Sequence, residues 1–215
     1  MAWHNPLKNK KVLITSGPTW VALDGVRVIS NRSSGQLGRL IAGECVKAGA
    51  KVTVLQGPVN ETIELKKVTL KPFTFFDELE DLITSELKKP YNVVIHAAAV
   101  SDFRPKQTWR KKLGSGKKIN LALVPTKKLI ESVKRINPKL LLVGFKLEPK
   151  VNERTAASLT KDLFKKAKCD LVVANSANGK KYHGYLLNNK GKCLSKAHSR
   201  PQMAQALVKQ LKGFL

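Results

Sequence analysis

Apolar runs of β-rich composition alternate with stretches of helical spacing along most of the chain. Residues 11–16 form the first apolar run, and from Gly35 to residues 48–49 apolar side chains recur at helical spacing before VTVL begins a second run. This strand–helix–strand unit requires a parallel pair of strands with a right-handed crossover. The stretch between Ser16 and Ser34 is polar and interrupted by Gly and Pro, so we expect a long loop there.

The alternation continues to the C-terminus. Helical spacing at Leu79, Leu82, Ile83 and Leu87 precedes the run VVIHAAAV, and helices at residues 129–133 and 154–168 precede LLLVGF and DLVVAN. GYLLNN and KCLSK flank a Lys-Gly pair and predict a β-hairpin, which a terminal helix follows. The pattern predicts one α/β domain over residues 11–215 with a single doubly wound, mostly parallel, Rossmann-like sheet, preceded by an N-terminal extension or linker over residues 1–10.

One segment departs from the alternation. Residues 103–118, FRPKQTWRKKLGSGKK, contain seven Lys or Arg residues and no period of buried positions. Loops of this length are usually functional or disordered. We therefore expect a mobile basic loop.

The formal charge of the chain is +25, from 40 Lys and Arg against 15 Asp and Glu. A field this positive concentrates anions such as nucleotides, phosphorylated metabolites or nucleic acid. Aromatic residues make up 6% of the chain and do not alternate with Lys as they do in RNA-binding motifs. This composition argues against nucleic acid as the partner.

The chain carries no sign of a membrane or secreted protein. No run reaches the ~18 apolar residues that span a bilayer, and MAWHNPLKNKK lacks the apolar centre of a secretory signal. Cys45, Cys169 and Cys193 are an odd number at wide spacings without a CxxC pair, so we predict reduced, structural thiols. We expect a cytoplasmic protein.

Small and polar residues follow the predicted strands, at the edge where open α/β sheets bind ligands. The loop after the first strand ends in Ser33, Ser34, Gly35 and Gly38, which open a helix whose N–H groups and dipole would favour phosphate. The dinucleotide fingerprint GxGxxG is absent. A simple helix cap with nothing bound is the alternative.

Two further clusters follow later strands. In AAAVSDFRP, Ala98 and Ala99 leave space for a base or sugar, and Asp102 could hold Mg²⁺ through water or merely cap a turn. Phe145 in GFKLEP could stack on a base and Asn175 in DLVVAN could hydrogen-bond it, the alternatives being a core Phe and a turn Asn. We expect all three clusters to converge, without direct protein ligation of a metal.

These motifs together resemble those of phosphopantothenoylcysteine synthetases. The resemblance rests on VLITSGPT, then Asp24, Val26 and Arg27, then ISNRSSGQLG and GAKVTVLQGP, followed in the family's order by AAAVSDFRP, residues 112–115, LVP, GFKLE and DLVVAN. It implies a ligase of coenzyme A biosynthesis that joins phosphopantothenate to L-cysteine through an acyl nucleotidylate. A nucleoside triphosphate, CTP or ATP, would be converted to the monophosphate and pyrophosphate with Mg²⁺ present.

The resemblance also implies roles for particular residues. Asn31 matches an asparagine that engages the acyl intermediate, Lys112 matches a mobile-loop lysine that would close over the phosphates, and Arg27 would grip a phosphate or carboxylate. The positions that match the family's nucleotide site are Ser33, Gly35, Gly38, Ala98, Ala99, Asp102, Phe145 and Asn175. The implied assembly is a homodimer.

Departures from the family's pattern leave the choice between CTP and ATP open. Many bacterial members carry an acidic residue after GPT and an NPDI-like motif, where this chain has TWVALD and VPTKKLI. Lys161 and Lys165 have the spacing of a family lysine pair but sit slightly too early, so no role is assigned to them. Bifunctional relatives carry a flavin-dependent phosphopantothenoylcysteine decarboxylase upstream, which implies such a partner, separate or formerly fused.

Three alternatives remain. An NAD(P)-dependent short-chain oxidoreductase needs a Tyr followed four residues later by Lys, but Ile95, Leu186 and Asn189 occupy the positions that follow the three tyrosines at this spacing. A basic nucleic-acid-binding module would need no triphosphate, and its binding would fall steeply with salt. An inactive relative would retain the motifs without turnover.

Overall fold

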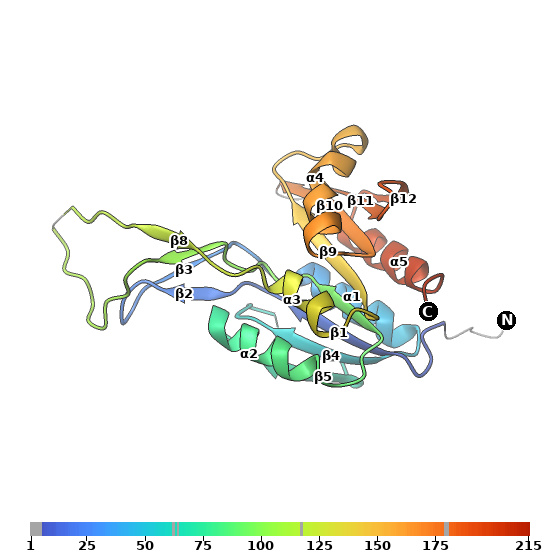
Figure 1. The fold of residues 1–215 in the computed structure, drawn as a ribbon, viewed down its shortest axis with the longest axis horizontal. Coiled ribbons are helices and arrows are strands. Elements are labelled where there is room, and N and C mark those ends of the chain that lie inside the picture. The colour runs from blue at the N-terminus through green and yellow to red at the C-terminus, as the bar shows by residue number, and fades with distance from the viewer. Residues whose placement is uncertain (1–5, 62, 64, 117, 179–180) are drawn as a thin grey trace.

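An eight-stranded sheet forms the centre of the computed structural model, which describes residues 6–61, 63, 65–116, 118–178 and 181–215 (Figure 1). Its strands are β1 (Lys11–Ser16), β4 (Lys51–Gln56), β5 (Val68–Pro72), β6 (Val93–His96), β9 (Leu141–Leu147), β10 (Leu171–Asn178), β11 (Lys181–Asn188) and β12 (Cys193–Ala197). Their order across the sheet is β12-β11-β10-β9-β6-β1-β4-β5. Neighbouring strands from β10 to β5 are parallel, and β11 and β12 extend the sheet as antiparallel strands.

The strand order changes direction at β1. After β1 the chain continues to β4 and β5 on one side, and then crosses to β6, β9 and β10 on the other. The carboxyl ends of β1 and β6 therefore form the topological switch point at which open α/β sheets bind ligands. The predicted doubly wound, Rossmann-like sheet is confirmed, as are the C-terminal hairpin and the helix that follows it.

Helices cover both faces of the sheet. α1 (Gln36–Lys47) and α5 (Arg200–Leu211) pack on one face, and α2 (Phe76–Glu86), α3 (Leu129–Ile136) and α4 (Glu153–Lys166) pack on the other (Figure 1). Alternate residues of β1 divide between the two layers: Val12 and Ile14 join the core under α1 and α5, and Leu13 joins the core under α2 and α3. Burial on both faces explains why the central strands are continuous apolar runs.

Two short antiparallel pairs of strands project from the sheet as an arm (Figure 1). β2 (Trp20–Ala22) pairs with β3 (Val28–Ser30), and β7 (Phe103–Pro105) pairs with β8 (Leu123–Pro125). We call residues 19–30 and 103–125 the arm. The expectation of a continuous loop from Ser16 to Ser34 is therefore wrong, and the basic segment 103–118 begins with a strand. Three-residue strands are too short to show alternation, and the partner of β7 lies beyond the basic loop.

Other segments also differ from the sequence pattern. β6 ends at His96, so the small residues of VVIHAAAV lie beyond the strand. The pattern does not predict β5, whose largely exposed residues and terminal Pro72 suit an edge strand. Leu7, within the predicted N-terminal extension, is fully buried. Residues 1–5 of that extension and Lys117 of the basic loop lie outside the described residues. The domain division at residue 10 stays a prediction.

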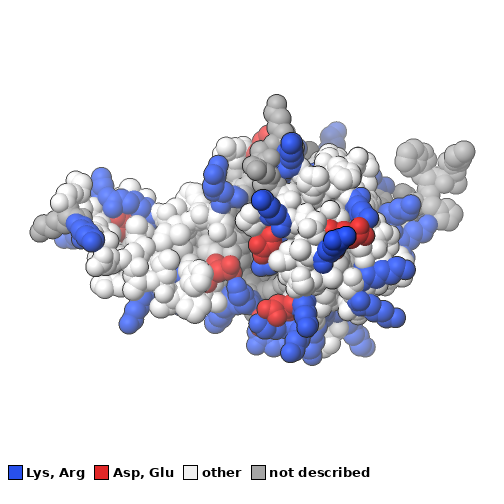
Figure 2. All heavy atoms as spheres, turned by 90° about the horizontal axis from the view of Figure 1, so that it is seen from above, with Lys and Arg blue, Asp and Glu red and all other residues white. Residues whose placement is uncertain are grey.

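The excess of positive charge is visible on the surface. Lys and Arg side chains are spread over the face drawn in Figure 2, on the body and at the end of the arm, with few acidic neighbours. Such a surface attracts anions generally, without selecting one of them. Within the described part of the chain, no helix combines the length and apolarity that a membrane span requires.

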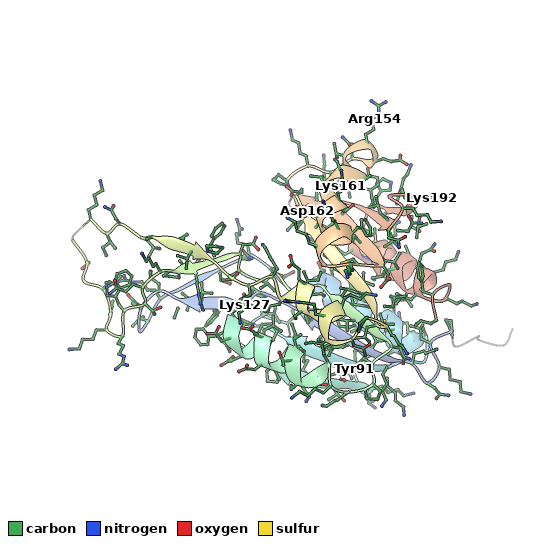
Figure 3. All side chains as sticks on the ribbon, in the orientation of Figure 1. Tyr91, Lys127, Arg154, Lys161, Asp162 and Lys192 are labelled. Atoms are coloured by element: carbon green, nitrogen blue, oxygen red, sulfur yellow. The ribbon has the colours of Figure 1, made fainter. Side chains whose placement is uncertain are left out.

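A buried carboxylate ties α2 to the strands at the end of the molecule opposite the switch point. Glu86 is 1% exposed and accepts hydrogen bonds from Lys71 Nζ (2.6 Å), Lys89 Nζ (2.7 Å) and Tyr91 Oη (2.5 Å). Burial by itself raises the pKa of Glu86, but the three hydrogen bonds lower it more, to about 2. The group lines a groove of about 700 Å³ at the amino ends of β1 and β4, where Figure 3 labels Tyr91.

We predict that Glu86 makes the fold sensitive to acid. Its folded-state pKa of about 2 lies below the ordinary value of 4.5, so its contribution is complete above about pH 4.5 and is lost as the pH falls toward 2. Glu86→Gln should lower the free energy of unfolding by about 1.5–3 kcal/mol at pH 7, because charged hydrogen bonds are lost. Urea unfolding at pH 7, 5 and 3 should show the gap between the two proteins closing with acid. A gap that is constant over this range would contradict the prediction.

Candidate functional site

The start of α1 lies directly against the end of β1. Ser16 Oγ donates to the carbonyl oxygen of Gly35 at 3.1 Å, and a Cβ atom on Gly38 would lie 2.4 Å from Ser16 Oγ. Gly35 has a φ of 66°, in the left-handed region that favours glycine. Both glycines are therefore required for the helix to begin at this point.

The first turn of α1 is suited to an anion. Gly35 precedes the helix without a side-chain cap, and the first turn contains no acidic residue. Ser33 Oγ accepts the N–H of Gly35 and Ser34 Oγ accepts the N–H of Gln36, both at 3.4 Å. The remaining N–H groups of the turn and the helix dipole favour a negatively charged ligand.

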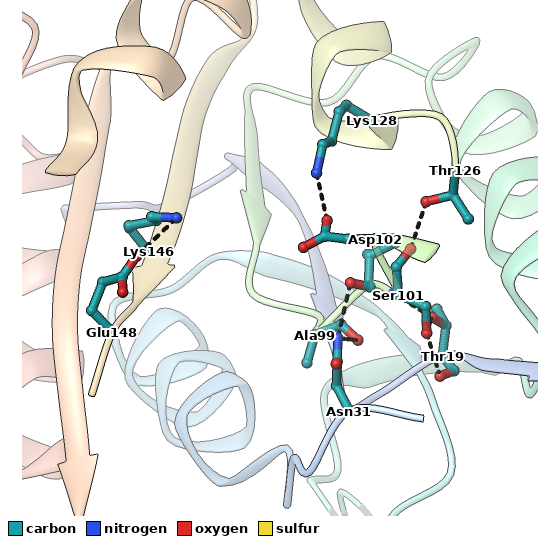
Figure 4. A network of polar contacts seen from close by, with 10 residues as sticks. Thr19, Asn31, Ala99, Ser101, Asp102, Thr126, Lys128, Lys146 and Glu148 are labelled. Atoms are coloured by element: carbon teal, nitrogen blue, oxygen red, sulfur yellow. Dashed lines mark hydrogen bonds and ion pairs between the residues drawn. The ribbon is translucent and has the colours of Figure 1, made fainter. Parts of the chain in front are cut away.

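Asn31 joins the first cluster to the second. Its Nδ2 atom donates to the carbonyl oxygens of Ala99 (3.3 Å) and Val100 (3.0 Å), as Figure 4 shows from close by. Pro18 and Ala99 also form a parallel β-bridge. The segments that follow β1 and β6 are thus held side by side at the switch point.

A buried histidine fixes the segment of small residues. Burial lowers the pKa of His96 to about 4, so the ring is neutral near pH 7. Thr15 Oγ1 lies 3.1 Å from His96 Nδ1 and accepts the N–H of Ala98 at 3.1 Å. This arrangement holds Ala98 at the carboxyl end of β6 and gives His96 a structural role.

Asp102 stands at the exposed border of the site. Lys128 Nζ lies 2.5 Å from its carboxylate, and both side chains are more than half exposed (Figure 4). Thr126 Oγ1 donates to the carbonyl oxygen of Ser101 at 2.6 Å, which brings the segment before α3 to the same place. The sequence pattern did not predict Lys128 as a neighbour of Asp102. The only local indication of Lys128 was a pair of lysines at the start of a predicted helix.

The third cluster occupies the same edge of the sheet on the neighbouring strands. Phe145, near the end of β9, is half-buried and packs against the core, whereas Asn175 on β10 is 7% exposed. The carbonyl oxygen of Asn175 accepts the N–H of Glu148 at 2.9 Å. Lys146 and Glu148, an ion pair at 3.0 Å, stand across from Asn31 and Asp102 in Figure 4. Lys161 and Lys165 are exposed on α4, where Figure 3 labels Lys161.

Arg27 and Lys112 lie apart from this edge, on the arm. Arg27 precedes the three residues of β3 and Asn31 follows them, so four steps along extended backbone separate their Cα atoms by ~13 Å. Arg27 Nη2 instead donates to the carbonyl oxygen of Leu113 at 3.0 Å, next to Lys112. The structure therefore brings two of the predicted site residues together at the end of the arm and gathers the others at the strand ends.

Among the residues that the structure describes, no cluster of metal ligands accompanies either group. Across the described ranges, no three His, Cys, Asp or Glu side chains are grouped so that they could hold an ion. Asp102 is the exposed carboxylate closest in sequence to the small-residue segment, and its partner is the lysine described above.

Comparisons with known proteins show the family to which this chain belongs. Residues 7–214 match the family described as the DNA/pantothenate metabolism flavoprotein C-terminal domain. The chain belongs to this family. It is 41% identical over 177 residues to the coenzyme A biosynthesis bifunctional protein CoaBC of Thermococcus kodakarensis, an alignment that covers 79% of this chain and 42% of the relative. The chain spans less than half the length of this relative and of the CoaBC protein of Borreliella burgdorferi, 42% and 45% respectively.

Solved structures share the fold over nearly the whole chain. The DNA/pantothenate metabolism flavoprotein from Streptococcus pneumoniae has a TM-score of 0.85 at 24% identity, covering 96% of this chain and 100% of that chain. The C-terminal domain of CoaBC has a TM-score of 0.80 at 26% identity, covering 98% and 97% respectively. The predicted resemblance to phosphopantothenoylcysteine synthetases, the synthetase part of CoaBC, is confirmed.

We predict that the contact between α1 and β1 tolerates no added methyl group. Gly38→Ala should lower the free energy of unfolding by about 1–3 kcal/mol, because overpacking displaces the start of α1. Gly43→Ala is the matched control in the same helix, since its Cβ would meet Leu65 only at 3.9 Å. This control should gain about 0.5–1 kcal/mol from helix propensity. Thermal and urea unfolding measure both, and equal effects of the two substitutions would contradict the prediction.

Proposed function

We propose that this protein is a phosphopantothenate–cysteine ligase of coenzyme A biosynthesis. The observation that carries the proposal is the hydrogen bonding of Asn31 to Ala99 and Val100. It joins two family motifs at the switch point, beside a helix start where Gly35 supplies no capping side chain. The relationship to CoaBC proteins, whose name states coenzyme A biosynthesis, supports it. A biosynthetic enzyme of this kind is expected in the cytoplasm.

The proposed reaction has two steps. A carboxylate oxygen of phosphopantothenate attacks the α-phosphorus of the triphosphate, and the bond to pyrophosphate breaks. The amine of cysteine then attacks the acyl carbon, the bond to the nucleoside monophosphate breaks, and the amine's proton leaves to solvent. Both steps bring anions together, which requires fixed positive charge and donors near the reacting atoms.

The residues at the strand ends would bind the nucleotide. The start of α1, with Ser33, Gly35 and Gly38, would receive phosphate oxygens on backbone N–H groups. The small residues Ala98 and Ala99 would leave room for the sugar or base, with Phe145 and Asn175 at the same sheet edge for stacking and hydrogen bonding. CTP and ATP both suit this arrangement.

Asn31 would contact the acyl intermediate. Its amide nitrogen donates to two backbone carbonyls at 3.3 and 3.0 Å, so contact with an acyl carbonyl requires the exchange of one of these bonds. We propose that the side chain both holds the 99–100 backbone in place and serves as the donor during reaction. A neutral amide suits this role because it does not compete as a nucleophile.

Cations outside the strand ends would complete the site. Lys112 would close over the triphosphate by movement of its basic loop, proposed to be mobile, together with the β2–β3 turn, so that Arg27 would accompany it. Asp102 would hold Mg²⁺ through water, and its exposed carboxylate fits such an outer contact better than direct ligation. The metal would supply charge neutralisation on the triphosphate.

We further propose that the arm mediates a homodimer. Large apolar residues are exposed along it, among them Val26 at 69% and Phe103 at 54%, with Leu123 at 47% on β8. Exposed apolar surface of this kind is usual at protein interfaces. Sedimentation velocity at micromolar protein should give a dimer, and a monomer would contradict this.

The chain spans less than half the length of these relatives. The decarboxylase that consumes the product is therefore proposed as a partner, either separate or fused.

The proposed function predicts a strict order of substrate dependence. Pyrophosphate release should require phosphopantothenate in addition to CTP or ATP with Mg²⁺, whereas release of the monophosphate should also require cysteine. Parallel assays with each substrate omitted measure both products and identify the preferred nucleotide. Equal triphosphate hydrolysis with and without phosphopantothenate would refute the assignment.

Asn31→Asp should separate formation of the product from binding of the nucleotide. The carboxylate removes the NH₂ donor and faces two backbone carbonyls and an acyl phosphate, so turnover should fall ~10²- to 10³-fold, as at oxyanion sites. Triphosphate affinity should change less. Turnover, nucleotide affinity and melting temperature are compared in one preparation. A folded variant with near-normal turnover would exclude Asn31 from the reaction.

A further inference from the structure

We infer that Asp24 is a positioning residue that locks the β2–β3 turn to the loop carrying Lys112, so that Arg27 and Lys112 are presented to phosphates as one unit. This inference deepens the proposed function and rests on it. The two cations come from segments far apart in the sequence. The buried side chain of Asp24 connects those segments.

The carboxylate of Asp24 uses its two oxygens for two different segments. Oδ1 accepts the N–H groups of Val26 (2.9 Å) and Arg27 (2.8 Å), within the turn. Oδ2 accepts the N–H of Leu113 at 3.0 Å, on the basic loop. The side chain of Asp24 is 0% exposed although it lies at the end of the narrow arm.

The Arg27 guanidinium also connects the β2–β3 turn to the basic loop. Nη1 lies 3.4 Å from Asp24 Oδ2, and Nη2 donates to the carbonyl oxygen of Leu113 at 3.0 Å. Both backbone groups of Leu113, the residue after Lys112, are therefore held by the turn. A further bond from the Trp109 N–H to the Leu23 carbonyl oxygen, at 3.2 Å, fixes the loop before Lys112.

Gly25 allows the two segments to lie this close. A Cβ atom at Gly25 would lie 2.4 Å from the carbonyl oxygen of Arg110. That atom belongs to the backbone, so the clash could be relieved only by moving the loop. Gly25 and Asp24 thus act on the same contact, one by leaving space and the other by hydrogen bonding.

A role in the turn alone does not account for Asp24. Asn or Ser could supply the single acceptor that the turn needs. The second oxygen of a buried carboxylate is instead directed to a loop, and the N–H of Leu113 is the largest of the contacts that lower its pKa below the usual value. Arg27 meanwhile remains 40% exposed and can still face a ligand.

Asp24→Asn separates the two roles. Its Oδ1 can still accept the N–H groups of the turn, but its NH₂ group would face the N–H of Leu113, donor against donor. Asp24→Ala removes both connections, and Gly25→Ala disrupts the contact without changing charge. The control is Asp162→Asn, an exposed carboxylate on α4 whose partner is Lys166 at 3.2 Å.

Two measurements are made on each variant of the full chain. Trypsin cleavage after Arg110, Lys111 and Lys112, followed by mass spectrometry without substrates, reports whether the loop is held. Pyrophosphate release with phosphopantothenate and the preferred triphosphate gives kcat and KM. For Asp24→Asn we expect faster cleavage and a ~10- to 100-fold loss of kcat/KM, mainly in kcat, at an unchanged melting temperature. Asp162→Asn should match the wild type in every measurement.

The outcomes are distinct. Cleavage of Asp24→Asn at the wild-type rate would overturn the connection between turn and loop. Faster cleavage with unchanged kinetics would leave Asp24 as a structural link between turn and loop and overturn its positioning role. A defect seen only in Asp24→Ala would reduce Asp24 to a turn residue and overturn that role as well. If the wild type itself releases no pyrophosphate, the proposed function fails and the positioning role fails with it, while cleavage still decides whether the connection exists.

Discussion

The close contact between the end of β1 and the start of α1 sets the geometry of the rest of the molecule. Ser16 and Gly38 approach to a distance that no side chain on the helix would permit, and Gly35 adopts a left-handed conformation beside them. The residues between Ser16 and Gly35 are far more numerous than a tight turn from β1 into α1 needs. They leave as β2 and β3 of the arm and return at Asn31, where hydrogen bonds to the segment after β6 anchor them.

This route divides the proposed chemistry between a fixed part and an extended part. The fixed part lies on the carboxyl ends of β1, β6, β9 and β10, where buried groups such as Thr15 and His96 hold the backbone. The extended part is the arm, whose strands are short and whose end carries Arg27 and Lys112. Cations on an extended segment can move toward a phosphate while the base-binding edge stays in place, which suits a reaction that closes over its substrates.

The sequence predicted the part of the structure that depends on local patterns. Central strands buried on both faces are apolar runs in the sequence, and the helices between them show a 3.6-residue period. The parallel sheet and its C-terminal hairpin could therefore be predicted from the sequence. The family motifs predicted Asn31, Ala99 and Asp102 as neighbours of a ligand. Lys128 was not predicted, because a lysine before a helix is common on any protein surface. Nothing in the neighbouring sequence indicates that it pairs with Asp102.

By itself, then, the sequence determined the fold class, the switch-point edge and the family, because periodicity and motif order are properties of neighbouring residues. Only the tertiary structure decided that the stretch after β1 is a hairpin, that Arg27 lies with the Lys112 loop and away from Asn31, and that Asp24 connects them. The contacts of Arg27 and Asp24 with Leu113 join residues more than eighty positions apart, each through one hydrogen bond. Such bonds leave no period in the sequence, since they depend on where the folded backbone brings each donor and acceptor.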